Sequence, residues 1–251
     1  MFAIFELSVI QWIMVIICTI FIGFTKTGLS SLGILVVTIL MYIFPAKASV
    51  GILLPMLIVG DLFAVTYYRK NVVWSYLLSL LPWVLAGIVA GYFVLDQVNS
   101  DQLKPLIGVL VLALIILHFS RERLGERFNQ LLPASLWFTA LMGILAGFTT
   151  MIGNAAGGVM AIYLLVKGLP KQDFVGTGAW FFLFVNVIKI PFYIYLGLIT
   201  FETITFNLWL IPTILIGAMI GVRVLKLLPQ KTFQVLVLGF AAIGAIRLLF
   251  G

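Results

Sequence analysis

Long apolar runs, interrupted by short clusters of charged and turn-forming residues, dominate the pattern along this chain. Most of them reach the roughly 20 residues that a helix needs to cross a bilayer. The ten apolar segments cover about residues 8–24, 29–44, 48–68, 72–95, 104–119, 134–150, 155–167, 174–196, 206–227 and 231–250. The pattern predicts an all-α polytopic membrane protein.

Four segments that are shorter than a span needs form two adjacent pairs: 8–24 with 29–44, and 134–150 with 155–167. Only a small, polar stretch that contains glycine separates the members of each pair, at residues 25–28 and 149–154. Each pair is therefore predicted to be a re-entrant or broken helical hairpin. Two full crossings per pair would place the neighbouring loops on the same sides, so both versions stay open.

The chain also repeats itself, which indicates two related halves. Residues of the first half recur in the same order in the second, at offsets that drift from 124 to 130. The recurring residues are Gly23-Phe24-Thr25 with Gly147-Phe148-Thr149, Pro45 and Gly51 with Pro170 and Gly176, and Pro82, Gly87 and Gly91 with Pro212, Gly217 and Gly221. We predict a single transmembrane domain, 1–251, with repeat one at 8–119, a linker at 120–133 and repeat two at 134–250. Each repeat is a hairpin followed by three transmembrane helices, and the paired glycines provide small-residue faces for helix packing.

Composition agrees with a membrane location, and the distribution of charge gives an orientation. Hydrophobic residues make up 63% and charged residues 9%, against roughly 25% charged in ordinary globular domains. The net charge of +7 is scattered over short loops, which excludes a nucleic-acid-binding face and fits the excess of cations in cytoplasmic loops.

Counting the cations in the loops distinguishes the two arrangements of the hairpins. If each pair begins and ends on one side, ten cations fall on one face and three on the other, whereas one broken span per pair gives seven against six. The ten are Arg69, Lys70, Arg121, Arg123, Arg127, Lys167, Lys171, Arg223, Lys226 and Lys231, and the three are Lys47, Lys104 and Arg247. We therefore predict inverted repeats, with the linker in the cytoplasm and both termini outside.

Two helix breaks within a membrane indicate where a site would lie. Irregular backbone survives there only where protein or water satisfies it, and paired breaks near the midplane form the sites of many secondary transporters. Ser30 or Ser31 would cap one of the helices that begin there, and Asn154 the other. Helix N-termini favour anions, and Lys26 would add a full positive charge. The predicted substrate-binding residues are Thr25, Lys26, Thr27, Gly28, Ser30, Ser31, Thr149, Thr150, Gly153 and Asn154.

Purely structural roles are the alternative interpretation of the same residues. Lys26 could extend to a membrane surface, and the threonines and glycines could serve helix packing alone. Asp61, which aligns with Asn186 at an offset of 125, could neutralise Lys26 or Lys189 or could carry a coupling proton. We therefore take Asp61, Asn186 and Lys189 as candidates for coupling or ion pairing.

Other functional classes find little support. The chain has one histidine and one cysteine, Cys18, and neither an HExxH motif nor a Walker A sequence, so we predict no metal, no cofactor and no catalytic residues. The alternatives to a transporter are an intramembrane enzyme and an assembly subunit of a membrane complex.

The first break, Gly23-Phe24-Thr25-Lys26-Thr27-Gly28-Leu29, and the second, from Gly147-Phe148-Thr149 through Gly153-Asn154-Ala155-Ala156-Gly157, resemble those of the TauE/SafE family. Residues Pro45-Ala46-Lys47-Ala48-Ser49, followed by Gly51, add to the resemblance, which extends over nearly the whole chain. It implies a permease of the bacterial cytoplasmic (inner) membrane that moves sulfite, organosulfonates or other sulfur-containing solutes. The expected function is thus secondary transport of a small anion by alternating access, with a proton as the candidate coupling ion.

Overall fold

The computed structural model describes residues 7–28, 33–99 and 135–229, together with the isolated positions 102, 105, 109, 231, 232, 235, 236 and 239. Its helices are α1 (Val9–Thr27), α2 (Gly33–Ile43), α3 (Ala46–Tyr67), α4 (Trp74–Gln97), α7 (Leu136–Gly153), α8 (Gly157–Val166), α9 (Lys171–Tyr195) and α10 (Phe201–Leu227). Ser30, Ser31 and the linker 120–133 lie outside the described residues, as does most of the segments predicted at 104–119 and 231–250.

Six of these helices are long and apolar enough to cross a membrane: α1, α3, α4, α7, α9 and α10. Together with the exclusively helical secondary structure of the described ranges, they confirm the prediction of an all-α polytopic membrane protein. The intervening α2 and α8 have only 11 and 10 residues.

Two of the four segments predicted to be short are longer in the structure. The segments predicted at 8–24 and 134–150 continue as helix to Thr27 and Gly153, which makes α1 and α7 long enough to span. Polar side chains in these last turns are buried against neighbouring helices and do not end the helix. Only the second member of each pair is truly short.

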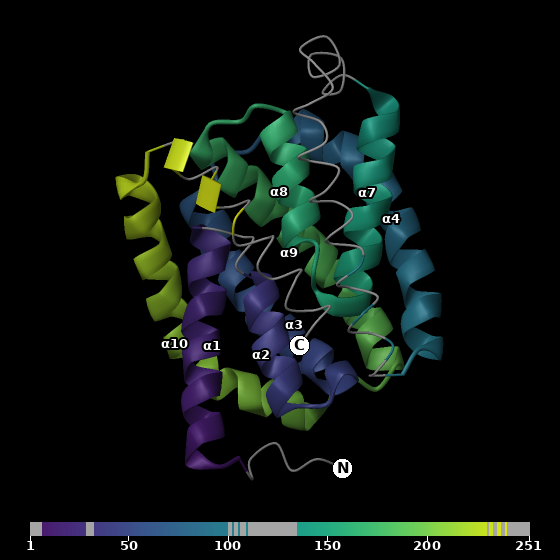
Figure 1. Ribbon diagram of the computed structural model, residues 1–251, viewed down its shortest axis with the longest axis vertical. Coiled ribbons are helices and arrows are strands. Elements are labelled where there is room, and N and C mark those ends of the chain that lie inside the picture. The colour runs from purple at the N-terminus through teal and green to yellow at the C-terminus, as the bar shows by residue number, and fades with distance from the viewer. Residues whose placement is uncertain are drawn as a thin grey trace.

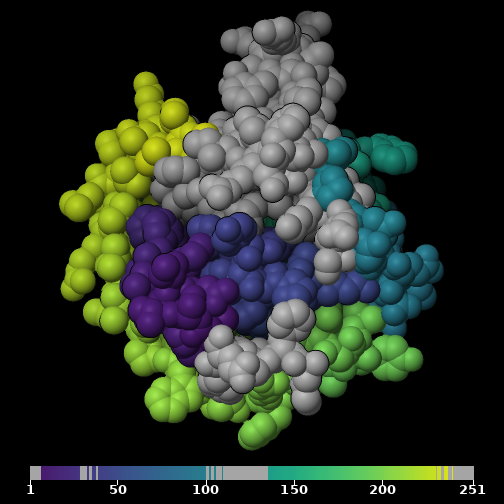
Figure 2. All heavy atoms as spheres, turned by 60° about the horizontal axis from the view of Figure 1, so that its bottom comes forward, coloured from purple at the N-terminus to yellow at the C-terminus, as the bar shows by residue number. Residues whose placement is uncertain are grey.

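Two pairs of long helices flank the molecule, and the remaining helices lie between them (Figure 1). On one side α1 packs along α10, and on the other α4 packs along α7; these are the two most extensive helix contacts in the described part of the chain. Figure 2 shows α1 lying between α10 and the segment that contains α2 and α3. Each outer pair thus joins a helix from the first half to one from the second.

Glycines bring the backbones of both outer pairs into direct contact. A Cβ atom on Gly217 would overlap the carbonyl oxygen of Ile20, and one on Gly87 would overlap that of Ile144. The two contacts correspond to each other at the offsets of 130 and 124 that the sequence shows. The predicted role of the small-residue faces in helix packing is confirmed. The inverted relation of the halves stays a prediction, which these matched contacts support.

Lysines lie at both ends of the helix bundle. At one end Tyr68, Asn71, Lys171 and Lys226 line a cavity of about 260 Å³. At the other end the Lys47 ammonium donates to the backbone carbonyl of Asp96, at 3.4 Å. Lysines assigned by the loop count to the cation-rich face therefore lie together.

Candidate functional site

A small cavity lies where the ends of α1 and α7 meet α3 and α9. Its volume is about 30 Å³, which is room for roughly one or two water molecules. Both halves of the chain contribute to its walls, and Gly33 and Gly157, the first residues of the short helices α2 and α8, belong to them. The described lining residues are Ile22, Thr25, Lys26, Gly33, Val36, Val37, Leu53, Leu57, Thr150, Asn154, Gly157, Phe182 and Asn186.

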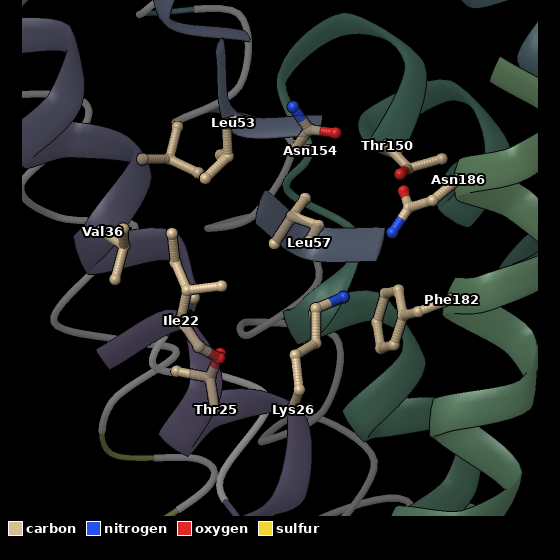
Figure 3. A pocket seen from close by; sticks show the side chains of 13 residues that line it. Ile22, Thr25, Lys26, Val36, Leu53, Leu57, Thr150, Asn154, Phe182 and Asn186 are labelled. Carbon is tan, nitrogen blue, oxygen red and sulfur yellow. The ribbon is translucent and has the colours of Figure 1, made fainter. Parts of the chain in front are cut away.

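Lys26 supplies a positive charge to this cavity from the last turn of α1. Its ammonium lies 2.7 Å from Oδ1 of Asp61 on α3 and 4.4 Å from the ring centroid of Phe182 on α9. Figure 3 shows the side chain rising from α1 toward that ring. Lys26 is buried and paired, so it does not extend to a membrane surface.

Asp61 joins the two halves of the molecule through its carboxylate. While Oδ1 faces Lys26, Oδ2 accepts a hydrogen bond of 2.7 Å from the amide nitrogen of Asn186 on α9. Asp61 and Asn186 are the two positions that the sequence aligns at an offset of 125. Of the cations that the sequence offered to Asp61, the structure pairs it with Lys26.

Lys189 brings a second buried ammonium to the same region, but it contacts neutral groups. It donates to the carbonyl oxygen of Thr150 at 3.1 Å, to the Thr150 hydroxyl at 3.0 Å and to Oδ1 of Asn154 at 2.5 Å. Three acceptors match the three N–H donors of an ammonium group. The cation also lies at the C-terminal end of α7, where the helix dipole favours positive charge.

The ionisable side chains around the cavity do not balance. Among the described residues there, two lysines face one aspartate, which leaves a formal charge of +1. All three side chains are buried. An excess charge that is cut off from water is costly unless a counter-charge joins it or an ammonium group gives up its proton.

Asn154 has a different role from the predicted one. It adopts a left-handed conformation, with φ at 53°, and ends α7 as its C-cap. The N-cap of α8 is Ala156, which makes no side-chain capping bond, so the prediction that Asn154 caps the second short helix was wrong. Its amide instead bridges α3 and α9, because Nδ2 donates to the carbonyl of Val50 while Oδ1 accepts from Lys189.

Of the other residues predicted to bind substrate, some line the cavity and some make contacts elsewhere. Thr25 and Thr150 line the cavity. The Thr27 hydroxyl donates to the carbonyl of Ala218 on α10, at 2.7 Å, and Thr149 bonds within its own helix. Gly28 follows α1 and lies near Gly221, and Gly153 is the last residue of α7.

Sequence reasoning missed Phe182 and two tyrosines that hold the ends of α1 and α7. Tyr68 donates to the carbonyl of Thr27 at 3.0 Å, and Tyr193 donates to that of Met151 at 2.8 Å. These tyrosines are 125 residues apart and their acceptors 124, which are the offsets of the internal repeat. Extending the alignment of the halves to aromatic residues would have identified the tyrosines, whereas Phe182 is one of many phenylalanines in apolar runs.

Comparisons with known proteins place the chain among membrane transporters. The sequence profile of a family described as "Sulfite exporter TauE/SafE" matches residues 15–248. The chain is 22% identical over 215 residues to the "Probable membrane transporter protein MamO" of Magnetospirillum gryphiswaldense, an alignment that covers 70% of this chain and 34% of the relative. The chain thus spans about a third of the length of the curated relative that it matches. No solved structure matches.

Proposed function

Because the chain belongs to the sulfite exporter TauE/SafE family of membrane transporters, we propose that it is a secondary transporter of a small anion. The substrate is sulfite, an organosulfonate or a related sulfur-containing solute. The anion binds in the central cavity between the ends of α1 and α7, which opens alternately to the two sides of the membrane.

The observation that carries this proposal is a positive charge around the cavity that no described acidic residue compensates. Lys26 on α1 and Lys189 on α9 come from different halves of the chain, and of these two lysines Asp61 forms an ion pair with Lys26 alone. A cation or a neutral solute would leave that charge unbalanced, whereas a monoanion would balance it. The N-terminus of α8, at Gly157, adds a positive dipole end to the wall of the cavity.

The size of the cavity supports alternating access. A cavity of about 30 Å³ has room for only one or two water molecules and cannot admit a sulfur oxyanion. This conformation is therefore the closed one. The anion enters only when the surrounding helices separate. The outer pairs, α1 with α10 and α4 with α7, are the natural rigid bodies, because their glycine contacts hold backbone against backbone.

Asp61 is the group through which a proton would couple to the anion. Protonation would remove its negative charge, release the ammonium of Lys26 and raise the formal charge of the site from +1 to +2. The anion would then bind more tightly. Proton and anion would therefore move in the same direction, with Asn186 keeping the carboxyl group in place through its hydrogen bond.

The cellular setting follows from the family and the loop charges. We place the protein in the bacterial inner membrane, with the end that carries Lys171 and Lys226 facing the cytoplasm. Both termini then lie outside.

Flux into proteoliposomes tests the proposal. Vesicles that contain the purified protein should take up radiolabelled sulfite in a saturable way, and a proton gradient of the same direction should increase the accumulation. Choline and glucose, as a cation and a neutral solute, should enter no faster than into protein-free vesicles. Uptake of choline or glucose with no uptake of sulfite would refute an anion transporter.

A further inference from the structure

Asn186 carries a buried acceptor in the wall of the central cavity that no donor among the described residues satisfies. The residue is 1% exposed and lines the cavity from α9. Its amide nitrogen donates to Asp61, but its Oδ1 atom accepts no hydrogen bond from the described residues.

Chemistry fixes the orientation of this amide. A carboxylate can only accept hydrogen bonds, so the NH₂ group of Asn186 must face Asp61 and the oxygen must face the other way. Figure 3 shows the oxygen on the side of Thr150, with the nitrogen turned away from it. Flipping the amide would place two oxygens against each other, so the unpaired acceptor is a stable feature of the site.

The charge of the site and the unpaired Oδ1 atom of Asn186 indicate which ligand would fit the cavity. A formal charge of +1 calls for a single negative charge, and the free Oδ1 atom calls for a hydrogen-bond donor. We propose that the cavity selects monoanions that carry a neutral hydroxyl donor, namely hydrogen sulfite or a hydroxyalkanesulfonate. While Asp61 is ionised, a dianion would exceed the charge of the site, and the ammonium group of an aminosulfonate would be repelled by Lys26 and Lys189. This inference rests on the proposed function and specifies its substrate.

Two sulfonates that differ only in a hydroxyl group provide the probe. Isethionate and ethanesulfonate are both monoanions with a two-carbon chain, but only isethionate has an O–H donor. Each would compete with radiolabelled sulfite for binding to the purified wild-type protein. We expect isethionate to compete roughly tenfold better, because a buried acceptor left without a partner forfeits about one decade of affinity.

Two variants connect this preference to Asn186. Asn186→Leu retains similar volume but removes the acceptor, so the ratio between the two competitors should fall to about one. The matched control is Asn207→Leu, because Asn207 is also buried with an unpaired Oδ1 atom but does not line the cavity. The control should keep the wild-type ratio. Because isethionate and ethanesulfonate are compared on the same protein, a general loss of anion affinity in a variant does not change the ratio between them.

The outcomes separate the inference from the proposed function. Sulfite binding with equal competition by isethionate and ethanesulfonate in the wild type would overturn the inference and leave the anion transporter standing. An unchanged tenfold preference in Asn186→Leu would also overturn it. Absence of both sulfite binding and sulfite flux in the wild type would contradict the proposed function itself. The comparison in the wild type requires no variant, so a failure of Asn186→Leu to fold would leave the test decisive.

Discussion

Lys26 and Asp61 form a buried ion pair whose counterpart in the other half is uncharged. The repeat aligns Lys26 with Thr150 and Asp61 with Asn186, so an ammonium and a carboxylate on one side correspond to a hydroxyl and an amide on the other. A buried ion pair contributes little net stability, but removal of one partner leaves an uncompensated charge. In the second half, Thr150 accepts a hydrogen bond from Lys189 and Asn186 donates one to Asp61.

The stability of single and double variants tests this pairing. Asp61→Asn should lower the free energy of unfolding by about 3–5 kcal/mol, because it leaves Lys26 buried without its carboxylate. The double variant Lys26→Met/Asp61→Asn should recover most of that loss. Denaturant unfolding in detergent measures both. Equal stability of the single and double variants would show that the two side chains do not depend on each other.

Anion affinity gives a separate test of Lys26. Lys26→Met keeps most of the side-chain length but removes the charge, so sulfite binding to the folded fraction should weaken roughly tenfold or more. Lys226→Met is the control, because this exposed lysine of α10 lies at the end of the bundle and does not line the central cavity. Wild-type affinity in Lys26→Met would remove this residue from the site.

At the level of single residues, the sequence could predict the participants better than their partners. Lys26, Asp61 and Lys189 stand out as charges within apolar runs, and the repeat aligns Asp61 with Asn186. Which cation Asp61 would face depends on how three helices pack, and spacing along the chain does not encode that. The left-handed conformation of Asn154 was missed for a related reason, since its amide is held by Val50 and Lys189.

At the level of helices, the positions of the apolar segments could be predicted, and some of their ends could not. The predicted 72–95 corresponds to α4 at Trp74–Gln97, and 174–196 corresponds to α9 at Lys171–Tyr195. Threonines and a lysine near residue 25 resemble a loop, but Asp61 and the carbonyl of Ala218 satisfy them within the bundle, and α1 continues to Thr27. Thr25, Lys26 and Thr27 therefore do not end α1.

The contact between the outer helices predicts the effect of a single methyl group. Gly217→Ala would drive its Cβ atom into the carbonyl of Ile20, and Gly87→Ala would do the same at Ile144. Each should lower the free energy of unfolding in detergent by about 1–3 kcal/mol, and the two losses should be similar. Gly239→Ala is the matched control, because a Cβ there meets nothing within 4 Å. A loss in the control as large as in the two interface variants would argue against close packing as the cause.

At the level of the whole molecule, the halves exchange partners. The sequence offsets predict two related units, but a simple tandem arrangement would pack each unit on itself. In the structure α1 of the first half lies along α10 of the second, and α7 lies along α4. Nothing in the apolar pattern selects these partners, because the glycine faces of α4 and α10 are alike. The exchange places the ends of α1 and α7 on either side of one cavity.

The orientation of the molecule can be tested by labelling single cysteines after the buried Cys18 has been replaced. Cysteines at Gln172, beside the cavity of the cation-rich end, and at Gln130, in the linker, should react only from the cytoplasm. One at Asn99 should react only from outside. A membrane-impermeant maleimide applied to intact cells and to inverted vesicles gives the measurement. Labelling of positions 130 and 172 from opposite faces would exclude the predicted topology.

The position of a bound anion would show whether the central cavity is the binding site. Crystals grown with selenite, a heavier analogue of sulfite, would locate the anion by its anomalous scattering. We expect a peak within hydrogen-bonding distance of the Lys26 ammonium, between the ends of α1 and α7, with Thr25 and Thr150 around it. Peaks confined to the ends of the bundle, with an unchanged ion pair between Lys26 and Asp61, would contradict it.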